Sequence, residues 1–338
     1  MAYLRGIDCC VPETVLSNDD LARLNPGWRS EAIYAKTGIR SRRVAAAGET
    51  AADLGYRAAE SLLARLDFDR GSIDALLFCT ESPDYPLPPS ACIMHERLKL
   101  PQSCAAFDFN LGCSGFVYGL WLANALIASG AAHNVLLVVG DTYSKYCSPH
   151  DLVTATIFGD GAAAVLITAS DRNAVASLGP AVLGTDGRGA EHLIVRAGAA
   201  RLHGTACASA CGVQPAPPRQ PPALFMNGPE VFSFTLSAVP AGIQRLLDRL
   251  GAGWEDIDLY LLHQANRFML EQLRLKMKLP PEKMPIDIED LGNTVSATIP
   301  ILMRRCELQG VLKPNHRCIL AGFGVGYSWG MMYLEWRQ

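Results

Sequence analysis

Apolar residues recur along this chain with two periods, one typical of helices and one of short buried strands. Residues 51–66, AADLGYRAAESLLARL, repeat apolar positions every three to four residues, which predicts an amphipathic helix. Residues 73–79 (IDALLFC), 134–142 (NVLLVVGDT) and 318–324 (CILAGFG) are short, nearly continuous apolar runs. Such runs are typical of strands buried on both faces of a parallel or mixed sheet, so the pattern predicts an α/β fold.

The same order of predicted elements occurs twice, roughly 180 residues apart. In the first copy a helix leads to the strand at 73–79, a helix closing in LKLP, the run CAAFDFN and then Leu111-Gly112-Cys113. In the second copy a helix leads to a strand at 257–263, a helix closing in MKLP, the run MPIDIED and then Leu291-Gly292-Asn293. We therefore expect two duplicated halves, residues 1–172 and 173–338.

Duplicated α/β halves usually pack about a pseudo-twofold axis, which brings equivalent strand-to-helix junctions together where ligands bind. Cys113 in the first half and His263 and Asn293 in the second are then expected to face one cleft. A stretch at about 201–223 is rich in Ala, Pro and Gly and has no period, so we expect an exposed loop within the second half.

Composition excludes several classes of protein. With 49% hydrophobic and 19% charged residues the chain is not disordered, and its 338 residues suffice for a two-part core. A net charge of -3 offers no general basic field for nucleic acid. No apolar run reaches the ~18 residues of a membrane span and no leader is recognisable, which predicts a cytoplasmic protein. Eleven scattered cysteines, an odd number, favour reduced thiols.

Cys113 is the cysteine with the most promising surroundings, between a β-like stretch and an apolar helix, in FDFNLGCSGF. Free N–H groups at a helix start favour a thiolate, so this position predicts a nucleophile. A packed core cysteine is the alternative. Likewise His263 is compatible with a structural role and Asn293 with a helix cap, so each signal is weak alone.

A Cys, a His and an Asn at equivalent junctions suit acyl-thioester chemistry. The motifs FDFNLGCSGF, LLHQAN, GNTVSATIP and FGVGYSWG, with TGIR at 37–40 and FGDG at 158–161, resemble β-ketoacyl-acyl-carrier-protein synthase III enzymes of the thiolase fold. The resemblance covers nearly the whole chain in order. A papain-like protease also uses Cys, His and Asn, but the sequence around its nucleophile is absent here.

The resemblance implies two βαβαβαββ halves that form a layered αβαβα core, and a homodimer. It also implies that Cys113 accepts an acyl group from acyl-CoA or an acyl carrier protein, while His263 and Asn293 stabilise the enolate from malonyl carrier protein. The backbone N–H groups of Cys113 and Val325 are expected to form the second oxyanion hole. No cofactor is expected beyond the coenzyme A or phosphopantetheine that carries the substrates.

Two departures from the family pattern concern the acyl donor. Family members sandwich the adenine of coenzyme A between a Trp and an Arg, and in register this chain has Ala32 and Leu152. Nearby Trp28, Lys36 and Asn266 are then the candidate contacts for coenzyme A or pantetheine. The missing sandwich makes an acyl carrier protein a serious alternative donor and favours a specialised pathway over housekeeping fatty-acid initiation.

Further candidates concern the carrier protein, the acyl chain and metal. Four basic residues are expected on one helix after His263, where they suit an acidic carrier protein, although a solvated face is the equally weighted alternative: Arg267, Arg274, Lys276 and Lys278. Leu87 matches a position where the family places an aromatic residue from the partner subunit against the acyl tunnel. His203, Cys207 and Cys211 lack a fourth ligand and usual spacing, so we expect no metal.

The sequence therefore predicts an acyltransferase that condenses an acyl thioester with malonyl carrier protein to give a 3-oxoacyl product. The main alternative is an acyltransferase that passes the acyl group to a hydroxyl or amine without condensation. A thioesterase and a non-catalytic partner subunit are two further alternatives, and the intact Cys113, His263 and Asn293 argue against the latter. The acyl group and the pathway are not specified by the sequence.

Overall fold

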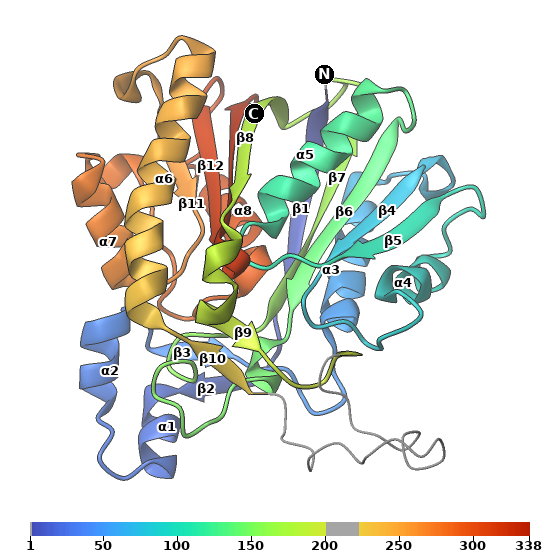
Figure 1. Ribbon diagram of the computed structural model, residues 1–338. Coiled ribbons are helices and arrows are strands. Elements are labelled where there is room, and N and C mark those ends of the chain that lie inside the picture. The colour runs from blue at the N-terminus through green and yellow to red at the C-terminus, as the bar shows by residue number, and fades with distance from the viewer. Residues whose placement is uncertain (1, 201–222) are drawn as a thin grey trace.

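The computed structural model describes residues 2–200 and 223–338 (Figure 1). Its central feature is a nine-stranded mixed sheet in the order β11-β12-β13-β8-β1-β7-β6-β4-β5. The first-half strands are β1 (Tyr3–Cys10), β4 (Ala75–Cys79), β5 (Ala105–Phe109), β6 (Asn134–Asp141) and β7 (Gly161–Thr168). The second-half strands are β8 (Ala176–Thr185), β11 (Leu259–Leu262), β12 (Arg317–Gly324) and β13 (Ser328–Trp336).

The two ends of the sheet repeat one pattern of pairing. Strand β4 runs parallel to β6, which pairs antiparallel with β7, and β7 pairs antiparallel with β1. In the same way β11 runs parallel to β12, which pairs antiparallel with β13, and β13 pairs antiparallel with β8. The two sets meet where Tyr3 and Leu4 pair with Ser177 and Ala176. The expected boundary at 172/173 lies between β7 and β8.

One element of the expected repeat is not a strand. The run MPIDIED at 284–290 corresponds to β5 but forms no ladder in the structure. Its backbone is used elsewhere: the carbonyl of Glu289 accepts hydrogen bonds from the N–H groups of Arg40 and Ser41, at 2.8 and 3.2 Å. The N–H of Asp287 donates to the side chain of Gln264 at 2.8 Å. Strand β11 therefore remains the edge of the sheet.

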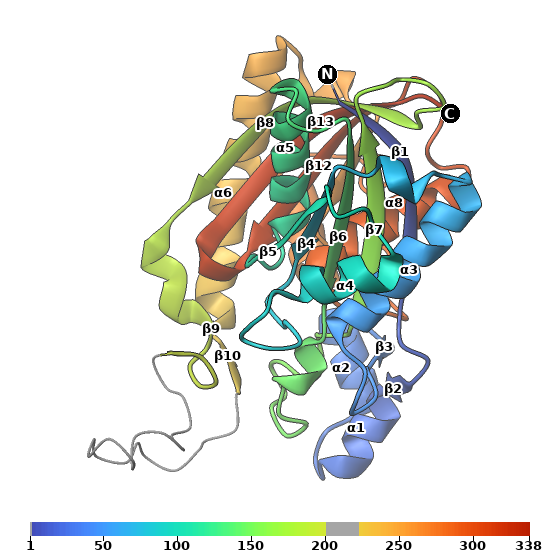
Figure 2. The ribbon, with the colours of Figure 1, turned by 90° about the vertical axis from the view of Figure 1, so that its right-hand side faces the viewer.

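Six helices complete a layered core (Figures 1 and 2). They are α3 (Ala51–Leu66), α4 (Ser90–Leu98), α5 (Gly115–Ala128), α6 (Gly228–Leu250), α7 (Arg267–Lys276) and α8 (Thr298–Leu308). Helices α5 and α8 lie between the two ends of the sheet, α3 and α4 cover the outer face of the first half, and α6 and α7 cover the outer face of the second. The α/β class and the layered core predicted from the sequence are observed.

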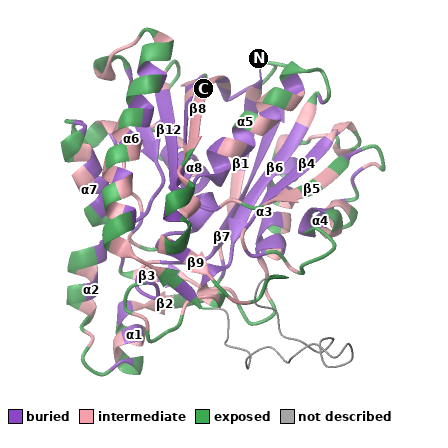
Figure 3. Cartoon of the chain, viewed as in Figure 1, coloured by how far each residue is buried: buried purple, intermediate pink, exposed green. Residues whose placement is uncertain are grey.

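Burial explains why these segments were recognisable. All eight residues of β7 and all five of β4 are buried, as continuous apolar runs require when helices cover both faces. Helix α5 is apolar on nearly every side because it packs inside the central cluster, where Phe116, Val117 and Leu120 are fully buried. Figure 3 shows this burial concentrated in the strands and the inner helix faces.

A smaller subdomain follows β1 and comprises β2 (Val15–Ser17), α1 (Asn18–Leu24), α2 (Ser30–Thr37) and β3 (Ser41–Arg43). Before α6, two short strands pair with each other, β9 (Leu193–Val195) and β10 (Leu224–Met226). The loop expected at 201–223 falls outside the described residues apart from Ala223. None of the helices in the described ranges combines the length and apolar character needed to cross a membrane.

Candidate active site

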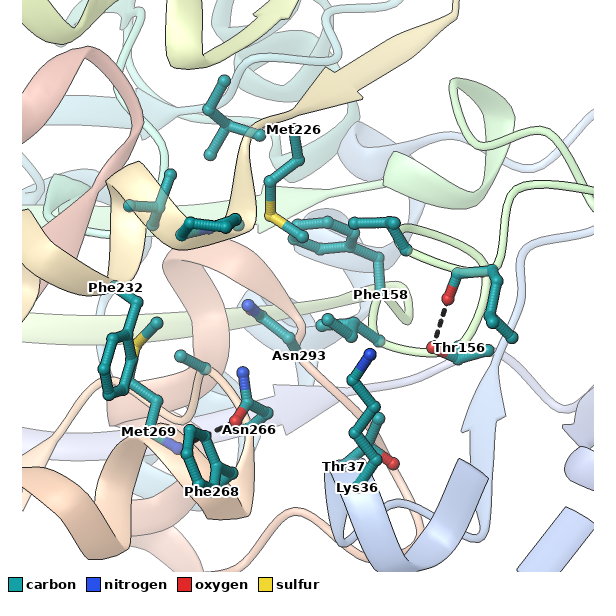
Figure 4. A pocket seen from close by; sticks show the side chains of 18 of the residues that line it. Lys36, Thr37, Thr156, Phe158, Met226, Phe232, Asn266, Phe268, Met269 and Asn293 are labelled. Atoms are coloured by element: carbon teal, nitrogen blue, oxygen red, sulfur yellow. Dashed lines mark hydrogen bonds between the residues drawn. The ribbon is translucent and has the colours of Figure 1, made fainter. Parts of the chain in front are cut away.

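A cavity of about 1010 Å³ opens between the α1–α2 subdomain and the second half of the fold. Its exposed rim includes residues of α2 and of α7, and its buried end is formed by Cys113, His263 and Asn293. Figure 4 shows side chains from α2, α6 and α7 pointing into this space, with Asn293 at its inner side. The structure therefore brings the three residues expected at equivalent junctions into one cavity.

Cys113 stands two residues before α5, on the turn that connects β5 to this helix. Its side chain is buried, and the backbone N–H groups of Val325 and of Cys113 itself lie close enough to the sulfur to favour its thiolate. The backbone of β12 passes very close, because a Cβ atom added at Gly324 would lie 2.8 Å from Sγ. The two N–H groups expected to form an oxyanion hole thus both lie near the nucleophile.

Burial opposes the thiolate that the place of Cys113 at a helix start favours. Burial raises the pKa of this thiol well above its ordinary value, and the charges of Glu81 and Asp141 raise it further. The Val325 and Cys113 N–H groups lower this pKa, but they do not outweigh desolvation. Helix-terminus stabilisation of a charge is worth only about 0.3–1 kcal/mol near a surface, whereas desolvation grows with depth.

His263 follows β11 and is held on three sides. Its N–H donates to the carbonyl of Ala321 at 2.8 Å, and its ring meets Phe323 edge to face at 5.5 Å between centroids. Ring atom Nδ1 lies 2.6 Å from the hydroxyl of Thr298, the first residue of α8. Burial lowers the pKa of His263 to about 3, so the imidazole is neutral around pH 7.

Asn293 follows a glycine with a positive φ of 67° and is almost fully buried. Its main chain is fixed by hydrogen bonds to Ile157 and Gly159, at 2.9 and 3.0 Å. Its side-chain Oδ1 accepts from the N–H of Val295 at 2.9 Å, which leaves Nδ2 facing Nε2 of His263 at 3.4 Å. The amide oxygen therefore binds the start of the next helical turn, while the amide nitrogen stands beside the imidazole.

The cavity rim contains the residues proposed for the donor's carrier. Trp28 and Lys36 line it, as do Ala32 and Leu152, the two positions where the adenine sandwich was found missing. Asn266 also lines it, and the same side chain caps α7 by accepting from the N–H of Met269 at 2.9 Å. Figure 4 shows Lys36 and Asn266 directed into the space.

The basic group after His263 is less uniform than its sequence spacing predicts. Helix α7 ends at Lys276, so Lys278 lies beyond it, with a positive φ of 56°. Arg274 already has two partners in its own chain: it forms an ion pair with Glu271 at 2.8 Å and donates to the carbonyl of Leu279 at 3.0 Å. Only Arg267 and Lys276 remain as exposed cations on this helix, and Arg267 pairs with Glu289 at 3.5 Å.

Leu87 does not line the cavity of a single chain. It lies on the loop between β4 and α4 and is 80% exposed. Tyr85 on the same loop, Phe107 on the edge strand β5 and Trp121 on α5 are also exposed apolar side chains. Any role for Leu87 at an acyl site therefore requires a second subunit.

Sequence reasoning did not single out several residues that shape the site. Thr298 contacts His263 and lies five residues after Asn293, so the motif GNTVSATIP contains it. Phe232 and Phe268, which stack at 5.5 Å between centroids, line the cavity from α6 and α7. Glu81 and Asp141 lie beside Cys113 from two strand ends. These contacts depend on tertiary packing and leave no local pattern.

Within the part of the chain that the structure describes, no group of three His, Cys, Asp or Glu side chains is arranged so that it could hold a metal ion. His203, Cys207 and Cys211, for which no zinc site was expected, lie outside the described residues.

A layered α/β fold with a Cys, a His and an Asn at one buried cavity end defines a class of acyl-thioester enzymes, and comparisons with known proteins assign the family. Residues 107–187 match the model of 3-oxoacyl-[acyl-carrier-protein] synthase III, and residues 247–336 match that of its C-terminal part. The chain belongs to this family. The predicted family, thiolase-like fold and acyltransferase class are thereby confirmed.

Individual relatives agree over almost the full length. A β-ketoacyl-[acyl-carrier-protein] synthase III of Streptomyces coelicolor is 36% identical over 99% of this chain and 97% of its own. A crystal structure of a 3-oxoacyl-(acyl-carrier-protein) synthase III is 47% identical, with a TM-score of 0.91 over 99% of both chains. A 3-oxoacyl-(acyl-carrier-protein) synthase from Burkholderia xenovorans is 38% identical, with a TM-score of 0.89 over 99% of this chain and 94% of its own.

Proposed function

We propose that this synthase transfers an acyl group from a thioester to Cys113 and condenses it with malonyl carrier protein. The observation that carries the proposal is the convergence of Cys113, His263 and Asn293 at the buried end of one cavity. A pantetheine arm can reach a buried sulfur only through such a passage, and the rim is open at Trp28 and Leu152.

In the first step the Cys113 sulfur attacks the donor's thioester carbonyl. A carbon–sulfur bond to Cys113 forms, the bond to the carrier sulfur breaks, and the Cys113 proton leaves with the departing thiol. The N–H groups of Cys113 and Val325, which lie near the sulfur, are the proposed donors for the oxyanion. Because these donors belong to the backbone, they need no reorganisation when the charge develops.

In the second step the malonyl group loses CO2, and the bonding electrons form an enolate. Asn293 Nδ2 and His263 Nε2 are adjacent, and we propose that the ring proton is on Nε2. The Thr298 hydroxyl has two acceptors within reach, the Val295 carbonyl at 3.1 Å and Nδ1 of His263 at 2.6 Å, and in this tautomer it donates to Nδ1. Two donors then meet one enolate oxygen. The enolate carbon attacks the acyl carbon, Cys113 leaves and takes up a proton, and a 3-oxoacyl carrier protein is released.

The rim favours an acyl carrier protein as the donor over coenzyme A. Ala32 and Leu152 supply no ring and no cation to sandwich an adenine, whereas Arg29 and Lys36 at the same rim suit the phosphate of a phosphopantetheine arm and an acidic carrier protein. Arg267 and Lys276 extend this basic surface along α7, while Arg274 is paired internally and Lys278 lies off the helix. Trp28 and Asn266 are the candidate contacts for the pantetheine arm.

We also propose a homodimer that buries exposed apolar side chains of the first half, Tyr85, Leu87, Phe107 and Trp121. Phe107 lies on β5, the free edge of the large sheet, and an unpaired edge strand is a ready surface for a second chain. Leu87 would then extend from one subunit toward the acyl site of its partner.

Intact-mass measurement after incubation with acyl-CoA and acyl-carrier-protein panels tests the proposal. We expect an acyl adduct on the wild type but not on Cys113→Ala, and its discharge with CO2 release when malonyl carrier protein is added. An adduct that malonyl carrier protein never discharges would favour transfer to a hydroxyl or amine. Free acid without malonyl carrier protein would favour a thioesterase, and no adduct from any donor would favour a non-catalytic subunit.

A further inference from the structure

Two carboxyl groups that the proposed reaction does not use lie beside Cys113. Asp141 is the last residue of β6 and is fully buried, while Glu81 follows β4 by two residues and is partly buried. They are linked directly, because the N–H of Glu81 donates to Asp141 Oδ1 at 2.8 Å. Ser296, three residues after Asn293, donates to Asp141 Oδ2 at 2.7 Å.

Among the residues that the structure describes, neither carboxyl group is paired with a cation. Within residues 2–200 and 223–338, no Lys, Arg or His forms an ion pair with Glu81 or Asp141. Burial raises the pKa of Glu81 to about 7, and burial together with the charge of Glu81 raises the pKa of Asp141 to about 8. The groups that face this pair are the thiols of Cys79 and Cys113 and the hydroxyls of Tyr143 and Tyr146.

The carboxyl of Glu81 packs against the peptide that carries the nucleophile. A Cβ atom added at Gly112 would lie 2.3 Å from Glu81 Oε2 and 2.7 Å from Cγ1 of Val325. Gly112 is therefore enclosed between this carboxyl and the loop that supplies an oxyanion-hole N–H. The hydroxyl of Tyr143 donates to the same Oε2 and fixes the carboxyl in this place. Tyr143 is buried, and its ring packs on cavity residue Phe158, 5.2 Å away.

We propose that Glu81 is a positioning residue for Cys113: its carboxyl supports the Gly112–Cys113 turn, and its negative charge, when present, opposes formation of the Cys113 thiolate. This inference rests on the proposed role of Cys113 as nucleophile. The neutral carboxyl is the form that permits the reactive thiolate.

The proposal predicts a particular dependence of thiol reactivity on pH. The thiolate fraction of Cys113 increases with pH. Glu81 ionises near pH 7, and its negative charge raises the pKa of the Cys113 thiol. Above about pH 7 the reactivity of wild-type Cys113 should therefore rise less steeply. Glu81→Gln keeps the shape and the contact with Tyr143 but carries no charge. Its Cys113 should therefore become more reactive than the wild-type thiol only on the alkaline side.

The experiment is alkylation of Cys113 with iodoacetamide from about pH 6 to 9, quantified by peptide mass spectrometry, with exposed Cys92 as the internal reference. The ratio of the Glu81→Gln rate to the wild-type rate should rise from about one to about five- to tenfold, since one pKa unit changes the thiolate fraction about tenfold. Asp84→Asn, on the same loop, is the matched control and should keep a constant ratio. A flat ratio for Glu81→Gln would overturn the proposal.

Tyr143→Phe supplies a second, independent test that does not require the Gln variant to fold. The Tyr143 hydroxyl lowers the pKa of Glu81. Removing this hydroxyl should therefore raise the pH at which the alkylation rate of Cys113 begins to rise less steeply, which we call the bend of the profile. An unmoved bend would contradict the assignment of the bend to Glu81. Because alkylation needs no acyl donor, failure of acylation with an intact alkylation profile would reject the proposed function and leave this inference standing.

Discussion

Asn293 Nδ2 lies 3.4 Å from His263 Nε2, and the orientation of both groups is set by neighbours on the turn that leads into α8. The N–H of Val295 fixes the Asn293 amide, and the hydroxyl of Thr298 faces the other ring nitrogen of His263. Val295 itself has a positive φ of 54°, which is unfavourable for a β-branched residue and costs on the order of 1–3 kcal/mol. The backbone is therefore strained at Val295, the residue whose N–H orients the Asn293 amide.

Replacing Asn293 by Ala should separate the two half-reactions. The variant loses one of the two enolate donors, which typically costs about 2.7–4 kcal/mol, or about 10²–10³ in the rate of CO2 release. Acylation of Cys113 uses other donors and should remain within about threefold of the wild-type rate, so it serves as the internal control. Radiolabelled CO2 release and intact mass measure the two steps. Equal losses in both steps would contradict the assigned role.

Thr298→Val tests the tautomer assigned to His263. The substitution keeps the side-chain shape but removes the hydroxyl that lies 2.6 Å from Nδ1, so the ring loses the partner that keeps its proton on Nε2. We expect condensation to fall about tenfold or more, because wrong ring tautomers disable the donor, with acylation nearly unchanged. Thr168→Val removes another buried threonine hydroxyl, far from the site, and is the control.

The sequence identified the fold and the three central residues because both are encoded locally. Cys113, His263 and Asn293 each follow a recognisable strand or its duplicated counterpart, and the family motifs surround them. Not every partner of a charged side chain is encoded in this way. The partner of Arg274, Glu271, has the local i,i+3 spacing, but the hydrogen bond from Arg274 to the carbonyl of Leu279 depends on how the chain turns after α7.

The pKa of the Cys113 thiol is a second property that the sequence could not predict. Its place before a helix suggested a stabilised thiolate, whereas its burial and two carboxyl groups raise its pKa. Glu81 and Asp141 come from strand ends 60 residues apart, so only the paired strands β4 and β6 bring them together. Similarly MPIDIED has the composition of a strand, but the backbone of Arg40 and Ser41 takes its hydrogen bonds.

His263 should make the protein less stable in mild acid. Burial lowers its folded-state pKa to about 3 from 6.5, so below pH 6.5 the unfolded chain binds a proton that the folded chain does not. Burial of neutral His263 therefore lowers the free energy of unfolding as pH falls from about 6.5, by up to about 1.4 kcal/mol per pH unit. Glu81 and Asp141, whose folded pKa values are raised, act in the opposite sense.

Comparison of His263→Gln with the wild type isolates that contribution. Urea unfolding at fixed protein concentration, at about pH 7.5 and pH 5, should show the wild type losing about 2 kcal/mol more than the variant between the two conditions. The carboxyl groups are common to both proteins and cancel in this difference. Parallel losses in the two proteins would contradict a neutral, buried His263.

The preference for the donor can be tested by restoring the missing rim residues. Ala32→Trp combined with Leu152→Arg places a ring and a cation at two positions that line the cavity rim. Stacking on a base is worth about 1–3 kcal/mol, so kcat/KM for acyl-CoA should rise about tenfold. The value for acyl carrier protein should stay within about twofold, since its phosphopantetheine carries no adenine. A gain for both donors alike would reject the interpretation of the rim.

Leu87→Phe tests whether this exposed residue limits the acyl chain of a partner subunit. Leu87 is 80% exposed in one chain and does not line that chain's cavity, so any effect on chain length must pass through a dimer. A larger ring should shorten the preferred acyl chain by about two carbons or more, since each buried CH2 needs space and contributes about 0.8 kcal/mol. Leu308→Phe, at a leucine that is 69% exposed on α8, controls for added surface bulk. Acyl-chain profiling of both variants, with sedimentation to record the dimer, makes the measurement. If Leu87→Phe stays dimeric and keeps the wild-type profile, Leu87 does not face the acyl site.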